Sequence, residues 1–117
     1  NSLRVVFDVS TEVVQNFQVY PPVITPNGDG INDETSFTYA LIHLVQPVDS
    51  QVSVYDLSGR LVRDVVSKAV GAGRFAPTWD GKDNEGLRVP PGVYLARVNV
   101  NAATGDISRA RLVQVAY

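Results

Sequence analysis

The sequence predicts an all-β fold in which antiparallel strands pack face to face. Short segments rich in Val, Tyr, Phe and Thr recur along the chain, and Gly, Pro, Asn or Asp closes each of them. No segment keeps apolar residues at helical spacing over three turns. We therefore expect an immunoglobulin/fibronectin-III-like antiparallel β-sandwich of about 7–8 strands, with almost no helix.

The clearest strand runs from Gln51 to Leu57, because apolar and polar residues alternate in it with the period of two that indicates a strand. Ser58-Gly59 separates it from the run Arg60–Val66. This spacing predicts a two-residue hairpin in which Gly59 supplies a positive φ. The other expected strands are Leu3–Val9, Phe17–Tyr20, Thr35–Leu41, Gly73–Trp79, Val93–Asn101 and Ile107–Val115.

The length and composition fit a single domain over residues 1–117. Apolar residues make up 44% of the 117 residues and charged residues 19%, which is enough apolar surface for a core. Residues 1–20 form either an added strand or the tail of a preceding domain. Trp79, the only tryptophan, ends an expected strand, so we expect it in the core together with Val52, Val54 and Tyr94.

Charge and residue types exclude several classes of function. Ten Lys and Arg against 12 Asp and Glu give a net charge of −2 with no basic run, so we expect no nucleic-acid partner. The longest apolar runs are too short to span a bilayer. The chain has no cysteine, and its one histidine, His43, has no neighbouring nucleophile motif, so we expect no enzyme.

A polar loop with oxygen-bearing residues at alternate positions lies between two apolar strands, in the run Thr25–Glu34. Such spacing, with Gly where the chain turns, is what a calcium loop requires. The expected Ca²⁺ ligands are the side chains of Asn27, Asp29, Asp33 and Glu34 and the carbonyl of Ile31. An EF-hand is excluded, because Thr25 and Ser36 stand at its first and twelfth positions. The same residues equally fit a turn that bonds its own backbone and holds no metal.

A second polar stretch runs from Trp79 to Tyr94 and contains Asp-Gly, Glu-Gly and Pro-Pro-Gly. These sequences mark tight turns. Its clustered carboxylates, Asp80, Asp83 and Glu85, are therefore expected to hold turns and not to act as an acid–base pair.

Several of these strings resemble a known family. The strings Val54–Arg63, Ala72–Arg74, Trp79–Gly86 and Val89–Tyr94 are similar, in order, to the Ig-like domain of the flagellar hook-capping protein. Ile24–Asp33 also looks like the start of the C-terminal domains of gliding-motility and type IX secretion cargo proteins. Asp56–Arg60 stands where that second group carries an Arg-Trp-Gly stretch, which favours the broader hook-capping type. The resemblance covers residues from Val23 to about Val115.

The resemblance implies a non-catalytic module, the C-terminal structural or secretion-sorting domain of a larger secreted or cell-surface bacterial protein. Its expected partners are neighbouring domains of that protein and the secretion or cell-surface machinery, and its expected location is extracellular. Two alternatives stay open: a carbohydrate-binding accessory module and a flagellar hook assembly domain. Three or more aromatic rings side by side in solvent among Tyr20, Tyr39, Tyr55, Phe75 and Tyr94 would favour sugar binding.

Overall fold

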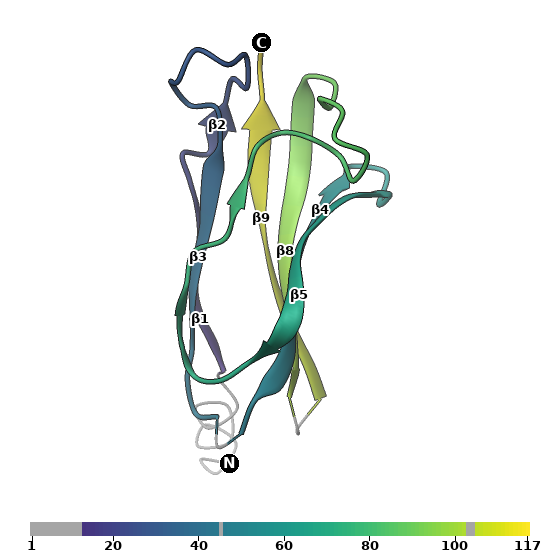
Figure 1. Cartoon of the computed structure of the whole chain (residues 1–117). Coiled ribbons are helices and arrows are strands. Elements are labelled where there is room, and N and C mark those ends of the chain that lie inside the picture. The colour runs from purple at the N-terminus through teal and green to yellow at the C-terminus, as the bar shows by residue number, and fades with distance from the viewer. Residues whose placement is uncertain (1–12, 45, 103–104) are drawn as a thin grey trace, which may run out of the picture.

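The structure, a computed structural model, describes residues 13–44, 46–102 and 105–117, and these contain nine strands in two sheets and no helix. The two sheets face each other along their length (Figure 1). This confirms the predicted all-β sandwich. Among the described residues no helix is long and apolar enough to cross a membrane. The expected strand Leu3–Val9 lies outside the described residues.

The smaller sheet is built around β3 (Thr35–Leu41), where buried residues alternate with more exposed ones. β1 (Val14–Tyr20) pairs with one side of β3 in antiparallel register. The other side is shared by β6 (Gly73–Phe75) and β7 (Thr78–Trp79).

The larger sheet has the strand order β2-β9-β8-β4-β5. Its four long strands are β4 (Val48–Asp56), β5 (Leu61–Val70), β8 (Gly92–Ala102) and β9 (Gly105–Val115), all in antiparallel pairs. β2 (Val23–Ile24) pairs with β9 in parallel, so one edge of the sheet departs from the expected antiparallel pattern.

Two expected elements differ from the structure. The run Gly73–Trp79 is two short strands, because it breaks at Ala76-Pro77 and proline has no N–H for a ladder. The β4–β5 hairpin has a three-residue loop, not two, since the Asp56 N–H donates to the Arg60 carbonyl at 3.0 Å across it. Gly59, with φ of 91°, closes this loop, as is typical of a three-residue turn ending in a left-handed residue.

The core between the sheets confirms the predicted packing of Trp79. Its side chain is 1% exposed and meets the Tyr94 ring edge-on at a centroid distance of 5.8 Å. Val52 and Val54 are fully buried in the same cluster. Further along the sandwich, the Phe17 ring packs against the rings of Phe37 and Tyr39.

Candidate functional site

The loops that carry the sequence motifs lie at one end of the sandwich, the end at which β9 finishes (Figure 1). They are residues 25–34 between β2 and β3, 57–60 between β4 and β5, and 80–91 between β7 and β8. A cavity of about 450 Å³ separates the second loop from the third, and its lining includes Asp56, Arg60, Asp83 and Glu85. The first loop packs on the third, because a Cβ on Gly81 would lie 2.8 Å from Cγ of Pro26.

In the loop 25–34, the side-chain oxygens of the expected calcium ligands accept hydrogen bonds from the loop's own backbone. Asp33 lies inside the loop, where Oδ1 accepts from the Gly28 N–H at 3.1 Å and Oδ2 from the Gly30 N–H at 2.7 Å. Asn27 Oδ1 accepts from the N–H of Asp29 at 3.1 Å. The loop is therefore held in shape by its own acceptors.

The remaining expected calcium ligands lie toward solvent. Asp29 Oδ1 accepts from the Ile31 N–H at 2.8 Å, and the Ile31 carbonyl accepts from Thr25 Oγ1 at 3.4 Å. Glu34 is exposed. Among residues 13–44, 46–102 and 105–117, no three His, Cys, Asp or Glu side chains gather as a metal would require. The hydrogen bonds fit a self-bonded turn, and calcium binding at this loop stays a prediction.

The β4–β5 hairpin is organised by one carboxylate. Asp56 Oδ1 accepts from Ser58 Oγ at 2.6 Å and from the N–H groups of Ser58 and Arg60, both at 3.0 Å. Its Oδ2 faces Arg60 Nε at 3.2 Å. The Ser58 hydroxyl and the Arg60 N–H are the main causes that hold the pKa of Asp56 below its ordinary value.

The loop 80–91 is held in the same manner by Asp83, as the turn interpretation predicts. Asp83 Oδ1 accepts from the N–H groups of Glu85 at 2.9 Å and Leu87 at 3.0 Å. Asp80 similarly accepts from the Lys82 N–H at 3.1 Å. The buried Trp79 ties in the start of the loop, since its Nε1 donates to the Lys82 carbonyl at 2.9 Å.

The same loop covers the first part of the outer edge of β5. The Asn84 N–H donates to the Val62 carbonyl at 3.0 Å, and Asn84 Oδ1 accepts from the Asp64 N–H at 2.9 Å. Arg63 adds a bond from its guanidinium to the Asp83 carbonyl at 3.0 Å. One asparagine thus replaces a neighbouring strand at an otherwise open edge, where unpaired backbone groups invite association.

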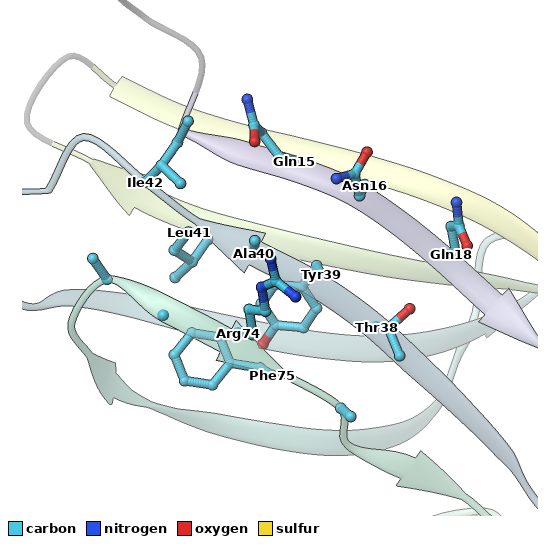
Figure 2. A pocket seen from close by; sticks show the side chains of 13 residues that line it. Gln15, Asn16, Gln18, Thr38, Tyr39, Ala40, Leu41, Ile42, Arg74 and Phe75 are labelled. Atoms are coloured by element: carbon cyan, nitrogen blue, oxygen red, sulfur yellow. The ribbon is translucent and has the colours of Figure 1, made fainter.

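A shallow groove of about 1080 Å³ runs across the smaller sheet (Figure 2). Amide side chains from β1, Gln15, Asn16 and Gln18, lie along one side of it, and Arg74 and Phe75 of β6 lie on the other. These groups can form hydrogen bonds with a polar ligand.

Four of the five aromatic side chains named for sugar contact are buried or partly buried. Tyr39 and Tyr94 are buried, at 5% and 6% exposure, and burial raises the pKa of both hydroxyls. Phe75 and Tyr55 are partly buried, which leaves Tyr20 as the one exposed ring of the five. These five residues therefore do not place three rings side by side in solvent, the arrangement that would favour the carbohydrate alternative.

Comparison with known proteins decides the family. The model of the FlgD Ig-like domain matches residues 28–106, more than half of the chain. The chain belongs to the FlgD Ig-like domain family. The basal-body rod modification proteins FlgD of Salmonella typhimurium (strain LT2) and Salmonella typhi are each 36% identical to it over 72 residues. That match covers 61% of this chain and 30% of either relative, so the chain spans less than a third of their length.

Solved structures show the same fold. Dimeric latent PorU from Porphyromonas gingivalis gives a TM-score of 0.65 at 22% identity, over 85% of this chain and 9% of PorU. FlgD from Xanthomonas campestris gives 0.52 at 22% identity, over 70% of this chain and 58% of that one. This family member therefore has the fold of modules found in flagellar and secretion proteins.

Sequence reasoning missed two of the residues that organise this end of the family member. Asp56 was expected in a strand and does end β4, but its bonding of the following turn was missed, although the order Asp-x-Ser-Gly is a usual signal for such a carboxylate. Asn84 gave no local signal, because its partners on β5 are 20 to 22 positions away along the chain.

Proposed function

We propose that this chain is a non-catalytic structural module of a larger exported bacterial protein, placed outside the cell or on its surface. The proposal rests on the hydrogen bonds that the carboxylates of the sequence motifs form. Asp33, Asp56 and Asp83 each accept backbone N–H groups of their own loop. Groups committed to loop structure are poor candidates for proton transfer or nucleophilic attack.

The finer form of the proposal is a C-terminal sorting domain that the type IX secretion machinery recognises. Two observations support it: Ile24–Asp33 resembles the start of sorting domains, and the chain has the same fold as PorU. A common fold does not by itself imply a common function. The partners would then be the secretion machinery and the neighbouring domains of the parent protein.

The test is export of a fused reporter. A reporter with a general export signal is joined to the N-terminal side of residues 1–117 and produced in a bacterium with a type IX system and in a strain lacking it. Surface or medium reporter that depends on the system supports sorting. A stable fusion retained equally in both strains supports a structural module without sorting. A fusion that is degraded in both strains contradicts the module as a self-supporting unit.

Flagellar hook assembly is the second candidate, favoured by the 36% identity to the Salmonella FlgD proteins. Its test replaces the matching segment of Salmonella typhimurium FlgD with residues 28–106. Restored swimming of a strain without its own FlgD supports this candidate, provided that the chimera accumulates to the normal level. A chimera that accumulates without restoring swimming counts against it.

A further inference from the structure

The outward face of the larger sheet carries a row of apolar side chains, where a half-exposed antiparallel sheet usually presents polar ones. Leu61 is paired with Tyr55, Tyr55 with Leu95, and Leu95 with Leu112. Residues directly opposite each other share a face of the sheet. The row faces away from the core, because its neighbours along the chain are buried: Val54, Ala96 and Val113.

This row continues into a patch at the end of the sheet. Leu112 is 59% exposed and Leu61 42%, and Val23 and Val93 flank them beside Gln114. We call these six residues the outer patch: Val23, Tyr55, Leu61, Val93, Leu95 and Leu112. A contiguous exposed apolar patch marks a surface that binds another molecule.

The next row of the same face carries one acid and one base on either side of a small residue. Ser53 is paired with Asp64 on β5 and with Arg97 on β8. Asp64 Oδ1 accepts from Ser53 Oγ and Gln51 Nε2. Within the described residues, Asp64 Oδ2 and the Arg97 guanidinium have no hydrogen-bond or ion-pair partner. Two strand spacings, about 10 Å, keep Asp64 and Arg97 apart in one copy.

We propose that the outer face of the larger sheet binds a second copy of this chain, with a two-fold axis that lies above β4 and runs nearly along it. Such an axis exchanges the strands on either side of β4, so β8 of one copy lies over β5 of the other. Arg97 then faces Asp64 of the second copy, and the reciprocal pair forms as well. In the next row, Leu95 faces Leu61 of the second copy and Tyr55 faces its own equivalent.

The charges select this axis over the obvious alternative. An axis above β8 would cover Leu112 more fully, but it would place Arg97 directly over Arg97 of the second copy. Asp49, which lies further along β4 on the same face, would repel its equivalent if the strands ran exactly in line. Packed sheets cross at about 30°, so the axis lies about 15° from the direction of β4, and this crossing carries the two Asp49 residues apart.

The size of the face sets the strength of the dimer. With the axis above β4, the strands that overlap are β5, β4 and β8, and at about 4.8 Å spacing and about ten residues long they give a face on the order of 500 Å² per copy. That is below the roughly 800 Å² per partner of a standard interface. The dimer is therefore weak, with a dissociation constant of about 10⁻⁵–10⁻³ M.

The test is sedimentation velocity of the 117-residue chain from about 10 µM to 1 mM, a range that brackets the expected dissociation constant. The wild type should shift from monomer toward dimer across the range. Arg97→Asp should weaken association by about tenfold or more, because it opposes two carboxylates. Asp64→Arg should do the same, and the double variant Arg97→Asp/Asp64→Arg should restore the wild-type constant. Arg109→Asp is the control: it makes the same charge change opposite Val98, whose side chain points into the core.

Thermal unfolding of each variant at 10 µM separates loss of the dimer from loss of the fold. A wild type that stays monomeric to 1 mM overturns the proposal. Folded single variants that dimerise like the wild type also overturn it, as does a folded double variant that stays as weak as its parents. Equal weakening by Arg109→Asp would show a general charge effect and would overturn it too.

Discussion

Two glycines in the loop 80–91 allow two effects on stability to be measured separately. One is the close approach between loops, and the other is an unfavourable backbone conformation. Gly81 has φ of 78° and Gly86 has φ of 83°, so an alanine at either position is forced into the same unfavourable region. Their surroundings differ. A Cβ on Gly81 would lie 2.8 Å from Cγ and 3.2 Å from Cβ of Pro26, whereas a Cβ on Gly86 would meet nothing within 4 Å.

The backbone penalty for alanine with a positive φ is about 1–2 kcal/mol and is common to both variants. Gly81→Ala adds an overlap with a proline ring, which cannot rotate away, and overpacking of this kind costs about 1–3 kcal/mol. We therefore expect losses of about 1–2 kcal/mol for Gly86→Ala and about 2–5 kcal/mol for Gly81→Ala. At about 4 °C per kcal/mol, the melting temperatures should fall by about 4–8 °C and 8–20 °C.

Urea unfolding followed by fluorescence of Trp79, which adjoins this loop, measures both losses, and thermal unfolding by circular dichroism checks them. In a Pro26→Gly background, Gly81→Ala should cost only the backbone penalty, because the proline ring that it would overlap is gone. Equal losses for Gly81→Ala and Gly86→Ala would refute the packing of the first motif loop on the third.

Three further predictions follow from single residues. Trp79→Ala should cost about 3–5 kcal/mol, because it opens a cavity in the core and leaves the Lys82 carbonyl without its donor; a midpoint in urea within error of the wild type would place the ring outside the core. Asp56 has a folded pKa below its unfolded value, so its stabilisation is present above the ordinary pKa of aspartate and is lost as the pH falls through the folded pKa. The difference in melting temperature between the wild type and Asp56→Asn should therefore shrink as the pH is lowered below about 4, and a constant difference would contradict this. If the loop 25–34 binds Ca²⁺, millimolar Ca²⁺ should raise the melting temperature of the wild type but not of Asp29→Ala; no shift in the wild type leaves the self-bonded turn as its only role.

The strands were predictable from sequence wherever alternating apolar and polar residues also determine which side chains are buried. Thr35–Leu41 forms as expected, because every second residue of it is buried between the sheets. Val23–Ile24 was not expected as a strand. Two residues are too few to show the alternating pattern of a strand, and these two pair with residues more than 90 positions away on β9. Pairing of that kind depends on the completed sheet, which no local pattern encodes.

The candidate site was predictable to the level of its turns and no further. The Asp-Gly and Glu-Gly pairs indicate tight loops, and Asp83 holds one of them as expected. The contacts between loops, such as Pro26 on Gly81 and Asn84 on β5, join segments that sequence reasoning treats separately. The same limit hid the outer patch, since its members alternate with core residues and become a row only through the register of four strands.

The motifs that place the chain in its family build the loops, and they also contain three members of the outer patch: Tyr55, Leu61 and Val93. The family match ends at residue 106, and Leu112, the most exposed member of the outer patch, lies beyond it. Val23 precedes the start of the match at residue 28. The matched region therefore holds the motif loops from residue 28 onward together with Tyr55, Leu61, Val93 and Leu95, while Val23 and Leu112 lie outside it. Because a fold hosts functions through the surfaces placed on it, membership of the family does not by itself assign the partner of this face.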